Sequence, residues 1–206
     1  ITAFTIDDTH TNPLVGLLAS VDNTHCTGVV PNGSITIQIN GGAPVADFII
    51  EWFEGNGTGT PLGTTVGTMG GLNNEIAQEI TGGTYTVRVT DNVTPNSGCS
   101  VTASFSISNN LSYPTPSGIP FPNTACDPTK SNGSILANVG GGTAGYTFHI
   151  FRGQNTLPAN EVTSGVATAA NLEAGIYTVQ AISDVTGCTG TTEVTVINNI
   201  LLPTID

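Results

Sequence analysis

Four cysteines are the residues of this 206-residue chain whose chemistry is easiest to assign. They lack the Cys-x-x-Cys spacing and the clustered histidines of a zinc site, and in an extracellular β-domain disulfide bonds are their default state. The simplest pairing joins Cys26 to Cys99 and Cys126 to Cys188. In an ordinary sandwich, however, the end of the first strand and the start of the last lie at opposite ends. Bridges between the two repeats that make up the chain, and free thiols, therefore stay open as alternatives.

Carboxylates are the second set of candidate ligands. Clustered carboxylates between sandwich domains can bind Ca²⁺, which takes six to eight oxygen ligands. Four aspartates near expected strand ends and junctions are candidates for such a site: Asp7, Asp8, Asp91 and Asp184. Their spacing is not specific to calcium, and solvated turn residues are the alternative interpretation. Asp91 and Asp184 could equally cap their own turns, and no cofactor other than Ca²⁺ is expected.

The sequence offers no support for catalytic chemistry. The histidines at 10, 25 and 149 do not recur between the repeats. The sequence contains no Gly-x-Ser-x-Gly, His-Glu-x-x-His, P-loop or dinucleotide-binding fingerprint. The acids at 51, 54, 75 and 79 have no clear acidic counterparts in the second half, where His149 stands at the position of Glu51. We therefore predict that the protein is not an enzyme.

Charge and hydropathy exclude two further classes of partner. The chain has 15 acidic and 3 basic residues, a net charge of −12, and only 9% charged residues, against roughly 25% in ordinary soluble domains. Such a surface repels phosphate, so we expect no nucleic-acid partner. No apolar run approaches the roughly 18 residues of a membrane span, so we expect no membrane insertion. Because residue 1 already lies in a β-like run, we expect a fragment of a longer secreted precursor.

An internal repeat of about one hundred residues organises the candidate residues. Cys26 and the Asn-Gly-Ser-Ile run at 32–35 recur one hundred positions later, at Cys126 and 132–135. The Tyr-Thr-Val run at 85–87 recurs at 177–179, and Asp91 to Cys99 recurs as Asp184 to Cys188. The separation between matching motifs becomes smaller along the repeat, which indicates that the second repeat has deletions between these motifs. The deletions fall in expected loops, where length changes are tolerated. The Asn-Gly pairs at 32–33 and 132–133 are tight-turn signals.

Alternating apolar residues predict antiparallel strands throughout. Ile35, Ile37 and Ile39 form one apolar face, and polar residues stand between them. Trp52 occupies the third-strand position, where immunoglobulin-like folds bury an aromatic, and Leu172-x-Ala-Gly-x-Tyr177 resembles a tyrosine corner. The predicted fold is all-β, as tandem immunoglobulin-like antiparallel β-sandwiches. The expected core aromatics are Trp52, Tyr85, Tyr146, Phe148 and Tyr177.

The expected domain organisation follows from the repeat and from a proline-rich junction. That junction holds four prolines between 111 and 122, and proline cannot donate to a strand ladder. We expect a semi-rigid linker there that feeds an edge strand. The segments in order are an end strand of a preceding repeat with its linker (1–20), the first repeat (21–110), the linker or edge strand (111–122), the second repeat (123–199) and the start of a further linker (200–206).

The second repeat contains a set of motifs in a fixed order: Cys126, Asn-Gly-Ser-Ile at 132–135, Gly141-Gly142, Tyr146-x-Phe148, Leu-x-Ala-Gly-x-Tyr-Thr-Val at 172–179, Asp184 and Gly187-Cys188. This set is similar to the SprB-type repeat of Bacteroidetes surface adhesins. The first repeat retains Trp52 and departs from the pattern at Ile80-x-Gly-Gly-x-Tyr85. Members of that family are often very large proteins exported by the type IX secretion system, and some act as mobile adhesins in gliding motility. The resemblance implies a bacterial cell-surface location and a role in adhesion or spacing, but no ligand.

These observations favour a structural or adhesive repeat segment, the stalk or filament of an adhesin. One alternative is a carbohydrate-binding module with exposed, coplanar aromatics, for which the candidates are Tyr113, Phe121, Phe53 and Phe151. Another is a filament subunit, in which residues 1–10 complete the sheet of another chain. The expected partners are neighbouring repeats of the same chain, like chains in a filament, and surface glycans or a substratum.

Overall fold

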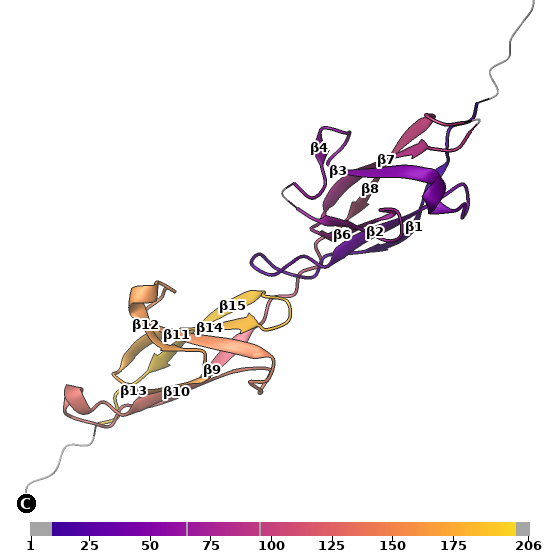
Figure 1. Ribbon diagram of the computed structural model, residues 1–206. Coiled ribbons are helices and arrows are strands. Elements are labelled where there is room, and N and C mark those ends of the chain that lie inside the picture. The colour runs from indigo at the N-terminus through magenta and orange to yellow at the C-terminus, as the bar shows by residue number, and fades with distance from the viewer. Residues whose placement is uncertain (1–9, 65, 95, 201–206) are drawn as a thin grey trace, which may run out of the picture. The chain divides into compact units, whose positions relative to one another are not determined.

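Alternation of apolar and polar residues builds most of the long strands of the computed structural model, which describes residues 10–64, 66–94 and 96–200 (Figure 1). Two units form. Unit 1 holds the described residues up to His25 together with Val30–Leu111. Unit 2 holds Cys26–Val29 and the residues from Ser112 onward. Each unit has two antiparallel sheets around its own core, so the prediction of tandem immunoglobulin-like sandwiches is confirmed.

Unit 1 consists of two four-stranded sheets, with the orders β1-β2-β6-β5 and β4-β3-β7-β8. Its strands are β1 (Val15–Val21), β2 (Gly33–Ile39), β3 (Phe48–Glu54), β4 (Thr60–Pro61), β5 (Thr68–Gly70), β6 (Ile76–Ile80), β7 (Gly83–Asp91) and β8 (Ser100–Ile107). A short 3₁₀ helix, η1 (Val45–Asp47), precedes β3. The parallel bridge between Asn23 and Asn109 ties the segment after β1 to the segment after β8.

Unit 2 repeats this arrangement with the sheets β13-β10-β9 and β12-β11-β14-β15. Its strands are β9 (Pro116–Phe121), β10 (Gly133–Val139), β11 (Tyr146–Arg152), β12 (Glu161–Ser164), β13 (Thr168–Leu172), β14 (Gly175–Ser183) and β15 (Thr189–Val196). The 3₁₀ helices η2 (Pro128–Lys130) and η3 (Pro158–Asn160) lie in its loops. The parallel bridge between Asn123 and Asn198 repeats the bridge of unit 1.

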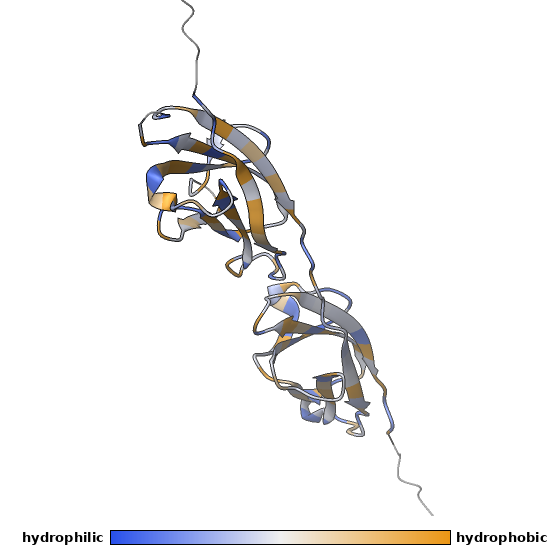
Figure 2. Ribbon diagram, turned by 90° about the vertical axis from the view of Figure 1, so that its right-hand side faces the viewer, coloured by the Kyte–Doolittle hydropathy of each residue, from blue (hydrophilic) through white to orange (hydrophobic). Residues whose placement is uncertain are grey.

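The two cores hold the residues that the alternation predicts, and hydrophobic bands interrupt paler segments along the strands in Figure 2. Ile35, Ile37 and Ile39 on β2 are at most 2% exposed. Trp52 is 1% exposed, and its indole Nε1 donates to the Asn74 carbonyl at 2.8 Å. Tyr85, Phe148 and Tyr177 are also buried, whereas Tyr146 is only partly buried at the edge of the second core.

The start of the first sandwich differs from the prediction. Val15–Val21 forms β1 and pairs with β2, although residues up to 20 were expected to lie in a preceding strand and linker. Most of β1 faces solvent and its register shifts between Leu17 and Ala19, so its alternation is too weak to mark it as a strand of this sheet. The end strand expected in residues 1–9 and the linker expected from 201 lie outside the described residues.

Both units contain the tyrosine corner expected from the second repeat. The Tyr177 hydroxyl donates to the Glu173 carbonyl at 2.8 Å, and the Tyr85 hydroxyl donates to the Thr81 carbonyl at 2.9 Å. Each bond ties the start of a long central strand to the residue four positions earlier. The corner of unit 1 forms although its sequence departs from the Leu-x-Ala-Gly pattern, because Gly82 and Gly83 allow the same close turn.

Replacing Tyr177 with phenylalanine is expected to lower the free energy of unfolding of unit 2 by roughly 1–2 kcal/mol, because the Glu173 carbonyl loses its buried donor. Tyr85→Phe should have the same effect on unit 1. Urea unfolding followed by circular dichroism measures both. Tyr113→Phe is the matched control, since Tyr113 is 60% exposed. Equal stabilities of all three variants and the parent chain would show that the corner contributes nothing.

Candidate functional site

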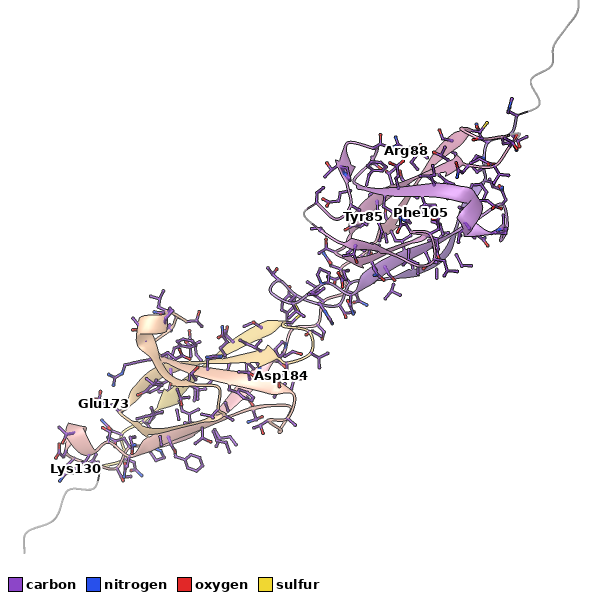
Figure 3. The ribbon with its side chains drawn as sticks, in the orientation of Figure 1. Tyr85, Arg88, Phe105, Lys130, Glu173 and Asp184 are labelled. Carbon is purple, nitrogen blue, oxygen red and sulfur yellow. A yellow bond between two sulfur atoms is a disulfide. The ribbon has the colours of Figure 1, made fainter. Side chains whose placement is uncertain are left out.

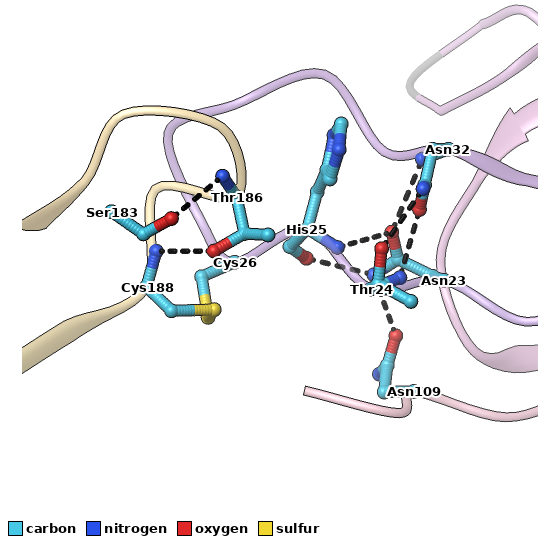
Figure 4. Close-up of a disulfide and its surroundings, with 9 residues drawn as sticks. All are labelled: Asn23, Thr24, His25, Cys26, Asn32, Asn109, Ser183, Thr186 and Cys188. Carbon is cyan, nitrogen blue, oxygen red and sulfur yellow. Dashed lines mark hydrogen bonds between the residues drawn. A yellow bond between two sulfur atoms is a disulfide. The ribbon is translucent and has the colours of Figure 1, made fainter. Parts of the chain in front are cut away.

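The most distinctive chemical feature of the structure is a disulfide bond between Cys26 and Cys188, 162 residues apart (Figure 4). Cys99 and Cys126 are free thiols. Both predicted pairs, Cys26 with Cys99 and Cys126 with Cys188, are therefore wrong. The cysteines do form a bridge that joins a loop of the first repeat to a turn of the second, which the sequence left open.

Strand length explains why neither repeat closes on itself. Cys99 directly precedes β8, and the bridge between Asn23 and Asn109 holds the segment leading to Cys26 beyond the other end of that strand. Eight β-residues span about 27 Å, and the three residues from Asn23 to Cys26 reach at most about 10 Å. A disulfide requires Cα atoms within about 7 Å. Cys126 and Cys188 are separated in the same way by β15.

The bonded cysteines are held in a hydrogen-bonded turn of unit 2, to which the segment Cys26–Val29 belongs. The Cys26 amide donates to the Thr186 carbonyl at 2.8 Å, and the Ser183 amide donates to the Cys188 carbonyl at 2.9 Å. The Thr186 amide donates to the Ser183 hydroxyl at 3.2 Å. Cys188 is fully buried. The disulfide is thus an ordered part of unit 2 rather than a loose surface link.

A buried asparagine positions the loop that carries Cys26. Asn23 is 2% exposed, and its amide donates to the His25 carbonyl and to Asn109 Oδ1. Its Oδ1 accepts from the amides of His25 and Asn32. We call this arrangement the asparagine clamp. Asn123 forms the second clamp, with Ala125, Asn132 and Asn198 as its partners.

The Asn-Gly pairs do not form the tight turns that the sequence predicted. Gly33 and Gly133 are the first residues of β2 and β10. A Cβ at Gly33 would collide with the Ile80 carbonyl, so close approach of backbone requires glycine there. The preceding Asn32 forms two side-chain hydrogen bonds with Thr24, as Asn132 does with Thr124. The repeated motif therefore supports the cysteine loops.

The calcium candidates do not gather in the described part of the chain. Asp91 Oδ1 accepts from the Val93 amide at 2.8 Å, which makes Asp91 the cap of its own turn. Asp184 Oδ1 accepts from the Thr147 hydroxyl at 2.7 Å. Asp7 and Asp8 lie outside the described residues. Among the described residues, no group of three or more His, Cys, Asp and Glu side chains is placed to hold a metal ion.

The backbone also corrects the alignment of the two turns. β7 ends at Asp91 and β14 ends at Ser183. The Asn92 amide donates to the backbone carbonyl of Asp47, and the Asp184 amide donates to the backbone carbonyl of Gly145. In each unit the acceptor lies just before the strand β3 or β11. The structural counterpart of Asp184 is therefore Asn92 rather than Asp91, so the two aspartates do not form a repeated acidic site.

Both arginines form ion pairs with glutamates, and Figure 3 labels one member of each pair, Arg88 and Glu173. Arg88 contacts Glu51 at 2.7 Å and lies 5.4 Å from the centre of the Phe53 ring. Arg152 pairs with Glu173, and that hydrogen bond raises the pKa of Arg152. These pairs cover strands β3 and β11, and they leave neither arginine as a ready anion-binding group.

A third pair gives a pH-dependent contribution to stability. His149 Nδ1 lies 2.6 Å from Glu161 Oε1, and this hydrogen bond lowers the pKa of Glu161 below its ordinary value of 4.5. A carboxyl with a lowered pKa stabilises the fold above its unfolded pKa and loses that contribution as the pH falls through the folded pKa.

Glu161→Gln is expected to lower the melting temperature slightly at neutral pH, because the charged acceptor of His149 is lost. The difference from the parent chain should vanish in acid below the pKa of Glu161. Calorimetry between neutral pH and pH ~3 measures it, with Glu193→Gln as a control whose carboxylate accepts from Gln154 instead. A difference that persists unchanged in acid would contradict the assignment.

Comparisons with known proteins identify no family. No family model matches the chain, and no curated protein matches it. Solved structures with a similar arrangement include murine CEACAM1b, with 15% identity, a TM-score of 0.32, and coverage of 82% of this chain and 92% of that one. The bacteriophage RB49 outer capsid protein Hoc has 13% identity, a TM-score of 0.35, and coverage of 92% and 59%. Domains 7–9 of the S-layer protein SbsC have 14% identity, a TM-score of 0.34, and coverage of 89% and 60%. Likeness at this level supports no conclusion on function.

One further finding concerns membranes. In the described ranges, no helix has the length and apolar character needed to cross a bilayer.

Proposed function

We propose that this chain is a structural and adhesive repeat segment of a large secreted bacterial cell-surface protein, with a mechanical rather than a catalytic role. The observation that carries the proposal is the duplication of structural residues alone. Both units keep the asparagine clamp, the tyrosine corner and the alternating core. The residues that could do chemistry differ between them, as His149 and Glu51 do at one matched strand position. Repetition of a scaffold without repetition of the histidines and carboxylates that could catalyse a reaction is typical of stalks.

The disulfide supports the secreted location. Disulfides form and persist in oxidising compartments, including the bacterial periplasm and cell surface. The acidic, lysine-poor sequence offers few cleavage sites to trypsin-like proteases, and the resemblance of the second repeat to SprB-type repeats points to the same location. A stalk or filament segment of an adhesin, as in gliding motility, is the specific role that we propose.

Connectivity supports the mechanical role. When the two ends of the chain are pulled, tension passes through the Cys26–Cys188 bond and bypasses residues 27–187, which contain nearly all of both sandwiches. Unfolding of a unit then adds no length between the ends beyond the release of β1 and β15, which lie outside the bridged loop. A segment of this kind keeps its length under loads that unfold an unbridged repeat.

Single-molecule stretching tests the proposal. The oxidised chain should extend by no more than the 26 residues up to Cys26 and the 19 from Cys188 onward, about 160 Å at ~3.5 Å per residue. After reduction the 206-residue chain should reach about 720 Å. The variant C99S/C126S, which keeps the bridge, should behave as the parent does. A full-length extension without reductant would exclude the load-bearing role.

A carbohydrate-binding role is the alternative that some observations favour. Phe53 and Phe151 are each 5% exposed and cannot stack on a sugar, but Tyr113 and Phe121 are 60% and 50% exposed. A glycan array probed with the parent chain and with Y113A/F121A tests this role. Binding that depends on these two rings would replace our proposal, and absence of binding would support it.

Strand complementation is the other alternative, and it concerns residues 1–10, of which 1–9 lie outside the described ranges. Deleting residues 1–10 and measuring the molar mass in solution tests it. A deletion that leaves an unchanged monomer counts against complementation.

A further inference from the structure

The two free cysteines are the repeat counterparts of the two bonded ones. Cys126 stands one hundred positions after Cys26, and each is preceded by a clamp asparagine, at 123 and 23. Cys99 directly precedes β8 as Cys188 directly precedes β15. The existing bond therefore joins a cysteine that follows a clamp asparagine, Cys26, to a cysteine in a turn before the last strand, Cys188. One cysteine of each kind, Cys126 and Cys99, forms no bond.

The loop that carries Cys126 is anchored by the same asparagine bonds as the bonded loop, although it contains η2, which has no counterpart after Cys26. Asn132 forms the same two hydrogen bonds with Thr124, each at 2.8 Å, that Asn32 forms with Thr24 at 2.8 and 2.9 Å. The Asn123 clamp reproduces every side-chain bond of the Asn23 clamp. The Cys126 thiol is exposed and lines a recess of about 230 Å³, with Ala125, Glu173 and Asn198 among its other walls.

The turn that carries Cys99 shares two backbone hydrogen bonds with the bonded turn, although it is three residues longer, with eight positions from Asp91 to Cys99 against five from Ser183 to Cys188. The Asp91 amide donates to the Cys99 carbonyl and the Gly98 amide to the Asp91 carbonyl, at 2.8 and 2.7 Å. In the bonded turn, the Ser183 amide likewise donates to the Cys188 carbonyl at 2.9 Å, and the Gly187 amide donates to the Ser183 carbonyl at 2.8 Å. The preceding glycines differ in their surroundings. A Cβ on Gly187 would collide with Val29, three residues after Cys26, whereas a Cβ on Gly98 meets nothing within 4 Å among the described residues.

We propose that Cys126 and Cys99 are complementary halves of a second disulfide of the Cys26–Cys188 kind, formed between two copies of this chain. Cys126 of one copy bonds to Cys99 of the other, and the turn at Gly98 takes the place against the Cys126 loop that the turn at Gly187 takes against Cys26–Val29. A second copy is the partner because it carries both halves, each anchored by hydrogen bonds that its bonded counterpart also makes. Because each copy keeps one half of each kind, the linkage is head to tail and can extend to a filament. This goes beyond the proposed role of one chain.

The chemistry is thiol–disulfide exchange with a small disulfide as the oxidant. The Cys126 thiolate attacks oxidised glutathione, forms a mixed disulfide and releases one glutathione thiolate. The Cys99 thiolate of the second copy then attacks the Cys126 sulfur and releases the second glutathione. Two cysteine thiols are oxidised, one glutathione disulfide is reduced to two thiols, and the two cysteine protons end on the two glutathiones.

Two single variants separate the halves. C99S keeps only the Cys126 thiol and C126S keeps only the Cys99 thiol, and both keep the native bond. Cys126 in C99S is first converted to its mixed disulfide with thionitrobenzoate, and C126S is added. Attack by Cys99 releases the coloured thionitrobenzoate anion, whose absorbance gives the rate. The native bond forms within one chain, where the two cysteines have a high effective concentration. The pairing of two separate chains lacks this advantage, so the variants are mixed at a protein concentration of about 1 mM.

Self-pairing provides the control. The rate of C99S with activated C99S, and of C126S with activated C126S, gives the intrinsic reactivity of each thiol. If docking positions the two halves, the cross rate should exceed the geometric mean of the self rates by about tenfold or more. Mass spectrometry of a peptic digest should then show the Cys99 peptide joined to the Cys126 peptide. Any smaller ratio overturns the proposal.

A positioning variant checks that the loop, and not exposure alone, gives the selectivity. Asn132→Ala in the C99S background removes the two bonds to Thr124. Its cross rate should fall to the self-pairing level while its rate with free cysteine stays the same. A cross rate unchanged by Asn132→Ala would show that the loop does not guide pairing and would overturn the docking geometry.

Discussion

Replacing Cys26 and Cys188 together with alanine is expected to lower the free energy of unfolding by roughly 5 kcal/mol, because the bridge restricts a loop of 162 residues in the unfolded chain. The loop contains residues 30–111 of unit 1 and the sandwich of unit 2 as far as Cys188, so both units should lose stability. Removal of the fully buried Cys188 sulfur adds a packing loss. At about 2–4 °C per kcal/mol for a chain of this size, the melting temperature should fall by roughly 10–20 °C.

Calorimetry of the parent chain, the double variant and the reduced parent measures this effect. Reduction breaks the bond without replacing any residue, so it should also lower the melting temperature, as the substitutions do. C99S/C126S serves as the matched control, because it removes two thiols that form no bridge. A drop of only about 2 °C or less in both the reduced and the substituted chain would contradict a stabilising role for the bridge.

Asn123→Ala should lower the free energy of unfolding of unit 2 by roughly 3 kcal/mol, the second largest effect that we expect. The Asn123 side chain makes four part-buried hydrogen bonds and is itself 5% exposed, and alanine removes all four. Two of those partners are the backbone amides of Ala125 and Asn132, on either side of Cys126. The cysteine loop should therefore loosen together with the fold.

Urea unfolding measures the loss of stability, and hydrogen exchange at the Ala125 and Asn132 amides measures the loosening. Asn198→Ala is the graded control, because it removes only the bond from the Asn123 amide and should cost about 1 kcal/mol. Equal effects of the two substitutions would show that Asn123 acts through Asn198 alone. Asn23→Ala should repeat the pattern in unit 1.

Much of the fold follows from local patterns. Ile35, Ile37 and Ile39 predict a buried strand face because side chains alternate along a strand, and all three are buried. Tyr177 predicts a corner because its bond to Glu173 closes over four residues. These features depend on residues near one another in sequence, and a repeat supplies two copies of the same pattern. β1 was not predicted as a strand of the first sandwich, because most of its side chains are exposed and show little alternation of apolar and polar residues.

Sequence alone determined the tandem sandwiches, the core and the absence of a repeated reactive set. Only the tertiary structure decided the cysteine pairing, because pairing depends on which strand ends meet. The parallel bridge between Asn23 and Asn109 carries the loop of Cys26 past the far end of β8, away from Cys99, and nothing local in the sequence reports that bridge. The clamp asparagines were missed for the same reason. Their partners at 109 and 198 lie 86 and 75 residues away in the sequence. Only the folded structure therefore shows that Asn23 and Asn123 are buried and bonded to these partners.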